Sequence, residues 1–169
     1  MIRYIGAALI ILACGGCGFS MAAACRREEN TLRQLLRALE YMSCELQYRQ
    51  PPLAELCGGA AKISGGQTGR VFSRLEQNIS HEDAPGVWIC MEKAVSAFPD
   101  LPMSARRIFL ELGQTLGQFD LPGQQKGFSL AMEQCRLVLE EMAQNRTGRL
   151  RSYQTLGLCA GAALVILFI

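Results

Sequence analysis

Histidine and aromatic side chains are scarce in this chain of 169 residues, which has one His, one Trp and an aromatic content of 7%. Its apolar residues are mainly Ala and Leu, with fewer of the β-branched and aromatic residues that strands favour. A hydrophobic content of 50% is also far above that of chains that stay disordered. These features disfavour an all-β fold and disorder, and the length fits one domain.

The scarcity of histidine also limits the chemistry that the chain can carry. The single histidine, His81, lies in a polar segment, so no His pair can bind a metal and no Ser-His-Asp set has local support. The glycine-rich stretches at Gly58-Gly59 and Gly65-Gly66 lack the Gly-Lys-Ser/Thr ending of a phosphate-binding loop. We therefore predict no catalytic, cofactor-binding or metal-binding residues, and we predict that the chain is not an enzyme.

Charge is low as well, with 19% charged residues and a net charge of +2. This value is too small for the basic surface of a nucleic-acid-binding protein, so no nucleic-acid partner is expected. Eight cysteines are present, and Cys14 and Cys17 have redox or zinc spacing but lie inside an apolar stretch. We interpret Cys44, Cys57, Cys90 and Cys135 as reduced thiols of a core. A membrane-anchored thiol redox or zinc protein stays the alternative.

Long apolar runs are present at both ends of the chain. The segment Tyr4–Cys25 has 22 residues without a charge, and Ser152–Ile169 has 18. Runs of this length can cross a bilayer as helices. We predict transmembrane helices over residues 1–25 and 152–169. A cleaved signal peptide, or lipid attachment at Cys14, is the other interpretation of the first run, and the sequence leaves open whether that span is retained.

The arginines indicate how the chain is oriented across the membrane. Only Arg3 lies outside the two spans, whereas Arg26, Arg27, Arg33, Arg37, Arg146, Arg149 and Arg151 flank the segment between them. Positive residues concentrate on the cytoplasmic side of membrane proteins. We therefore expect residues 26–151 to form a cytoplasmic domain, with both termini on the other side of the membrane.

Helical periodicity, interrupted by Pro and Gly, runs through this middle segment. From Arg26 to Gln50 an apolar residue recurs every three or four positions, and Pro51-Pro52 ends the pattern. Further helices are expected over about 52–64, around 71–79, around 87–98 with Asp83 as its cap, from Ser104 as cap to about 118, and from about 122. The predicted fold is all-α, a compact bundle of about six helices flanked by N- and C-terminal transmembrane helices.

Glycines at helical spacing are the strongest candidates for interaction sites. In the last span Gly157 and Gly161 lie one turn apart, which lets another helix approach closely in lipid. Gly113 and Gly117 repeat this spacing in the fifth helix, where glycine costs about 1 kcal/mol relative to alanine and so indicates tight helix contact.

Asp120 and Gln124 follow these glycines at the start of the sixth helix. They can act as a helix cap and a polar first turn, or they can fix an angle between helices or bind a partner.

Several of these residues resemble a known family, the stage III sporulation protein AB family of endospore-forming bacteria. The resemblance covers nearly the whole chain, with Phe119 as one departure at a position where the family usually has a small hydroxyl residue. The matching pieces, in order, are Arg26-Arg27, Leu39, Glu45–Tyr48, Pro52-Leu53, Leu112-Gly113, Leu116-Gly117, Asp120, Gln124, Arg151–Gly157 and Gly161.

The resemblance implies a noncatalytic membrane protein of the channel complex that links mother cell and forespore. The family's cytoplasmic bundle is similar to platform domains of type II secretion and type IV pilus systems, which couple a separate secretion-type ATPase to a membrane assembly. The implied partners are the ATPase called stage III sporulation protein AA and other membrane proteins of the complex. A receptor-like sensor would share this architecture, and only identified partners would distinguish it.

Overall fold

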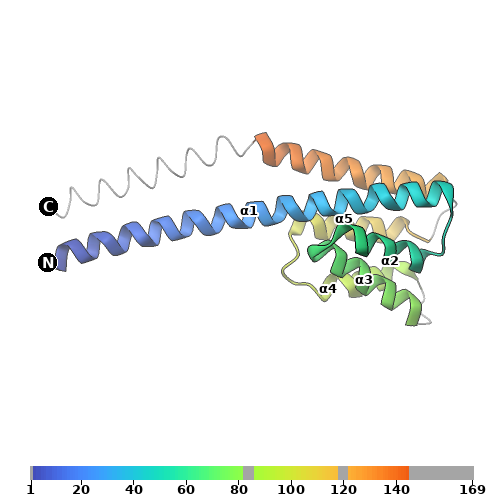
Figure 1. Cartoon of the computed structure of the whole chain (residues 1–169), viewed down its shortest axis with the longest axis horizontal. Helices are drawn as coiled ribbons and strands as arrows, with labels where there is room; N and C mark the ends of the chain where they lie inside the picture. Colours follow the sequence, from blue (N-terminus) through green and yellow to red (C-terminus); the bar gives the residue numbers. More distant parts are fainter. Residues whose placement is uncertain (1, 82–85, 118–121, 145–169) are drawn as a thin grey trace. The chain divides into compact units, whose positions relative to one another are not determined.

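Six α-helices and no strand make up the part of the chain that the structure, a computed structural model, describes: residues 2–81, 86–117 and 122–144, with side chains from residue 23 onward (Figure 1). The helices are α1 (Ile2–Tyr48), α2 (Leu53–Ser64), α3 (Gly66–His81), α4 (Val87–Ser96), α5 (Met103–Thr115) and a last helix over residues 122–144. The predicted all-α fold and its six helices are confirmed.

The structure does not show the transmembrane helices predicted at the two ends of the chain. Within the described residues, no helix combines the length and the apolar character that crossing a membrane requires. The predicted second span, residues 152–169, lies outside the described residues. By its contacts the chain divides into two units, one of them Glu28–Leu139, which we call the bundle, and the other the residues on either side of it.

The apolar side chains of α1 form one side of the bundle core. Its side chains at Leu32, Leu35, Leu39, Met42 and Leu46 are at most 6% exposed. The helix ends where Gln50, at a φ of 47°, directs its backbone N–H back to the carbonyl of Glu45. Pro52 then serves as the N-cap of α2, as expected because proline cannot continue a helix from within but fits at its start.

Two glycines make the sharp turn between α2 and α3. Gly65 and Gly66 have φ values of 64° and 54°, a left-handed conformation that costs other residues about 1–2 kcal/mol. The two helices then cross closely, because a Cβ on Gly69 would lie 2.8 Å from the backbone oxygen of Ala61. The predicted break after the helix over about 52–64 is confirmed.

The starts of α4 and α5 differ from those predicted. Gly86, in an extended conformation, is the N-cap of α4, so a start capped by Asp83 is wrong, although Asp83 itself lies outside the described residues. Pro102 is the N-cap of α5, and Ser104 lies inside that helix. The Ser104 hydroxyl donates a hydrogen bond to the Glu28 carboxylate on α1, which explains why it does not cap its own helix.

The core is completed by three fully buried phenylalanines from three helices, Phe72, Phe109 and Phe128. The rings of Phe72 and Phe109 meet edge to face, with centroids 5.2 Å apart. Cys57, Cys90 and Cys135 are buried as predicted, whereas Cys44 is exposed. Cys44 follows the buried Met42 by two positions, which is about 200° around a helix, so it faces away from the core.

Candidate interaction surface

Gly113 is the contact point between α5 and α4. It is buried, and a Cβ at this position would lie 2.8 Å from both Cβ and Cγ of Met91 and 3.6 Å from the Trp88 ring. The two helices can approach this closely only because Gly113 has no side chain. The structure thus accounts for a glycine inside an amphipathic helix by packing within the bundle.

Gly117 does not lie in the helix, contrary to the prediction. The helix α5 ends at Thr115, and the next residue, Leu116, is extended. Gly117 has a φ of 77°, which favours glycine, and its missing Cβ leaves room for the Val87 side chain at the start of α4. The equal spacing of Gly113 and Gly117 therefore has two separate causes, a close helix contact and a left-handed turn.

Of the other four candidate residues, the structure describes one. Gln124 is half-buried in the first turns of the helix over residues 122–144. Asp120, Gly157 and Gly161 lie outside the described residues. An interaction role for any of the six candidates stays a prediction.

Buried polar side chains tie the helices together, and sequence reasoning missed them. Asn78 donates a hydrogen bond of 3.0 Å to the backbone oxygen of Cys90, linking α3 to α4. Thr68, fully buried, donates one of 3.1 Å to the backbone oxygen of Thr31, linking α3 to α1. Buried polar groups need such partners. In the sequence, the one sign of these hydrogen bonds is that Asn78 and Thr68 are polar residues on the apolar side of α3.

Glycines in α2 provide two more close contacts that the sequence did not reveal. The Glu76 carboxylate of α3 lies over Gly58, and the Tyr41 phenol of α1 lies over Gly59. Successive residues of a helix point about 100° apart, so the pair of glycines turns one bare patch toward each neighbour.

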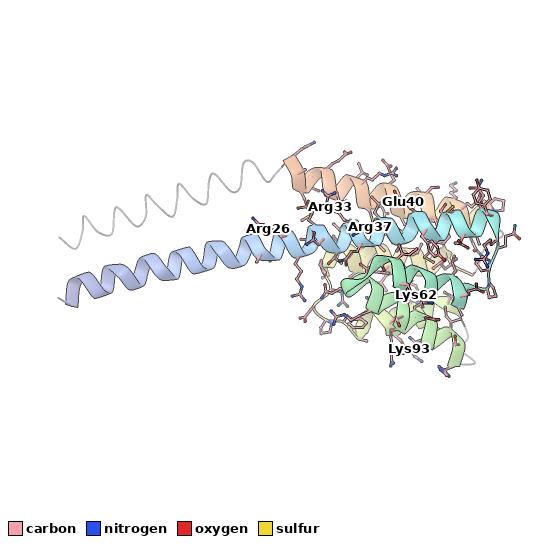
Figure 2. The ribbon with its side chains drawn as sticks, viewed as in Figure 1. Arg26, Arg33, Arg37, Glu40, Lys62 and Lys93 are labelled. Carbon is pink, nitrogen blue, oxygen red and sulfur yellow. The ribbon has the colours of Figure 1, made fainter. Side chains whose placement is uncertain are left out.

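Charged residues are spread over the outside of the bundle as exposed ion pairs. Figure 2 shows Arg33, Arg37 and Glu40 along α1. Arg33 pairs with Glu29 at 2.9 Å, and Arg136 of the last helix pairs with Glu40 at 3.5 Å, with both side chains about half exposed. Such exposed pairs contribute about 0–1 kcal/mol each to the free energy of unfolding, so they add little to the stability of the bundle.

The buried thiols are unsuited to redox chemistry. Burial raises the pKa of Cys57 to about 12, with the nearby Glu76 carboxylate adding to the shift, and burial raises the pKa of Cys135 to about 12. A thiol reacts as its thiolate, so both are held in the unreactive form. Among the described residues, no group of three or more His, Cys, Asp or Glu side chains is placed to hold a metal ion. His81 is exposed at the end of α3.

We expect the described thiols to fall into two kinetic classes with an alkylating reagent near neutral pH. Cys44 should react at once, whereas Cys57 and Cys135 should react only after unfolding, because their pKa values lie far above the working pH. Mass spectrometry of the alkylated peptides distinguishes the classes. If Cys57 reacts in the folded protein as fast as Cys44, the thiol redox alternative gains support.

The same pKa shifts make stability depend on pH. The pKa of each thiol is higher in the folded state than in the unfolded state, so the folded state retains the proton longer. This contribution is complete below about pH 9 and is lost as the pH rises toward about 12. Urea midpoints measured across this range should fall, and a Cys57→Ala, Cys135→Ala protein should show a shallower decline.

The outer surface of the bundle also carries large apolar side chains. Its exposed large apolar side chains are Tyr48, Ile63, Met103, Leu130 and Leu137, with exposures from 48% to 78%.

Comparison with known proteins gives one consistent result. The sequence profile of the family described as "Stage III sporulation protein AB" matches residues 3–169. A protein of the same name from Bacillus subtilis (strain 168) is 27% identical over 169 residues, covering 99% of each chain. A solved structure of a stage III sporulation protein AB, 22% identical, superposes with a TM-score of 0.64, covering 72% of this chain and 98% of that one, which establishes a shared fold.

The match extends over almost every residue, and the solved relative has the same helical fold. The resemblance first noted in the arginine, glycine and tyrosine motifs is therefore confirmed. The chain belongs to the stage III sporulation protein AB family.

Proposed function

We propose that the chain is a noncatalytic membrane platform component of the channel complex between mother cell and forespore. In this function the bundle couples a cytoplasmic secretion-type ATPase, similar to stage III sporulation protein AA, to the membrane proteins of the complex. The observation that carries the proposal is the match to the sporulation family over residues 3–169.

Membrane anchoring by both ends of the chain is part of this proposal. The runs Tyr4–Cys25 and Ser152–Ile169 carry no charge, and seven arginines flank the segment between them against one outside. This pattern supports a bundle that faces the mother-cell cytoplasm from the membrane around the forespore. A cytoplasmic ATPase could then reach it.

The construction of the bundle supports a mechanical function. Tight glycine contacts at Gly113 and Gly69 and buried hydrogen bonds from Asn78 and Thr68 connect helices distant in sequence. Such contacts resist sliding of one helix past another, because packed interiors transmit strain. A body of this kind can pass a displacement from an ATPase to a membrane anchor without chemistry of its own.

A substitution at Gly157 tests the proposed contact between helices in the membrane. We expect Gly157→Leu to impair spore formation and co-purification of membrane partners while the bundle stays folded. A leucine would hold a neighbouring helix away and remove close contacts worth about 1 kcal/mol each. Spore counts and affinity purification from a sporulating host lacking its own AB protein measure both effects.

Leu158→Ala, one position along the same segment, is the matched control and should be close to neutral. If Gly157→Leu protein accumulates normally and supports full sporulation and co-purification, the glycine pair is not an interface. The platform function would then depend on the bundle alone.

A further inference from the structure

Two of the exposed apolar side chains lie at one end of the bundle, the end that contains Glu28. Met103 is 78% exposed and Ile63 is 48% exposed. Met103 precedes Ser104, whose hydroxyl donates a hydrogen bond to Glu28. Ile63 is in the last turn of α2, next to the start of α3, where Thr68 is hydrogen-bonded to Thr31. Both therefore lie within about two turns of Glu28 along α1.

Chain length holds this end close to the proposed first span, whatever the orientation of the bundle. Only Arg26 and Arg27 separate Glu28 from Cys25, the last residue of the uncharged run. These residues belong to α1, and three helical steps rise about 4.5 Å. The headgroup layer on each side of the hydrocarbon core is about 5–8 Å thick. The end of the bundle at Glu28 is thus held at the level of the headgroups.

The charges at this end suit an anionic surface. Lys62 and Arg70 are exposed beside Ile63 and at the start of α3, and Arg70 lies 5.6 Å above the Phe98 ring. The carboxylates here are Glu28, which accepts the Ser104 hydrogen bond, Glu29, which pairs with Arg33, and Asp100, whose backbone oxygen accepts a hydrogen bond from Gln67. Arg106, hydrogen-bonded to the backbone oxygen of Phe98, and Arg33 bring the cations to four against three carboxylates, so basic groups exceed acidic ones.

We propose that this end of the bundle rests on the lipid surface, with Ile63 and Met103 inserted among the headgroups and with Lys62 and Arg70 on anionic phosphates. Amphipathic groups bind in this way when apolar side chains and cations share one face. The contact restricts the tilt of the bundle and so defines which surface a cytoplasmic partner meets. The inference rests on the proposed function, because it requires the membrane anchor.

The experiment uses the full chain in vesicles of equal parts phosphatidylcholine and phosphatidylglycerol. Cysteines other than the buried Cys57, Cys90 and Cys135 are replaced by alanine, and one new cysteine carries an environment-sensitive fluorophore. The fluorophore at Met103→Cys or Ile63→Cys should be quenched by lipids with nitroxide-labelled headgroups. Tyr48→Cys is the matched control: it is also 78% exposed, but twenty residues from Glu28 along α1, about 30 Å away, so it should not be quenched.

The electrostatic part has its own variants. One cation near an anionic leaflet contributes about 1 kcal/mol, so Lys62→Gln or Arg70→Gln should lower the ratio of docked to undocked bundle about fivefold each. Phosphatidylcholine vesicles remove both contributions at once, so they should lower this ratio about 25-fold or more. Lys126→Gln, beside Gly127 and Thr115 at the other end of the bundle, should change nothing.

Vesicle flotation separates failure of this inference from failure of the proposed function. If the chain floats with the vesicles but residues 63 and 103 are quenched no more than residue 48, the docking is wrong and the anchor stands. If these positions are shielded only when an ATPase is added, the end is a protein-binding surface and the docking is wrong. If the chain does not float, the anchor and the docking are both wrong.

Discussion

Phe109→Ala is expected to destabilise the bundle by about 3–5 kcal/mol, the cost of removing a large aromatic side chain from a packed core. Phe109 is fully buried and meets the ring of Phe72 edge to face at 5.2 Å. The loss combines the transfer free energy of the ring, the cavity left behind and the aromatic contact. Total stabilities of domains are about 5–15 kcal/mol, so much of the variant could unfold at growth temperature.

Urea unfolding of the full chain measures this effect, with the fluorescence of Trp88, the single tryptophan, as the reporter. Leu130→Ala is the matched control, because this leucine is 56% exposed and its removal should change the free energy of unfolding by less than about 0.5 kcal/mol. Equal losses in the two variants would contradict the core described here.

Gly113→Ala should reverse the usual effect of replacing a helical glycine. In an exposed helix this change stabilises by up to about 1 kcal/mol. Here the new methyl group would lie 2.8 Å from Cβ and Cγ of Met91, and a Cβ cannot move without its backbone. We expect a net destabilisation of about 1–3 kcal/mol, as for other overpacked cores, together with a changed Trp88 spectrum because that ring lies alongside.

Two controls distinguish a local clash from a general loss of helix stability. Gln114→Ala changes the exposed neighbour and should be close to neutral. Gly59→Ala places its methyl group against the phenol end of Tyr41, which can swing away, so it should be much milder than Gly113→Ala. If Gly113→Ala stabilises the protein, α4 and α5 are not packed as closely as the structure shows.

Local patterns were sufficient to predict most of the helices. The stripe along α1 has the period of a helix. The prolines at 51 and 52 mark the junction of α1 with α2, and the glycines at 65 and 66 mark the junction of α2 with α3. Prediction by residue type did less well. Cys44 was assigned to the core because cysteine is often buried, although its angle from Met42 on the helix places it outside.

Contacts between distant segments were beyond sequence reasoning. Ser104 has a typical capping residue type and position, but its partner is Glu28, 76 residues away. Gly113 and Gly117 looked like one motif, although one faces Met91 and the other makes a turn. The proposed lipid-facing end shows the same limit, because Ile63 and Met103 are assigned to it only by the hydrogen bonds from Thr68 and Ser104 to α1.

Photo-crosslinking tests most directly whether the bundle couples an ATPase to the membrane. The full chain, with a photoreactive phenylalanine at successive exposed positions of the bundle, Leu130 and Leu137 among them, is co-expressed with the AA-type ATPase. A probe at the buried Leu35 is the control. We predict ATPase adducts from a contiguous patch of exposed positions and none from Leu35. Absence of adducts from every exposed position, while the ATPase crosslinks to other membrane proteins of the complex, would contradict the proposal.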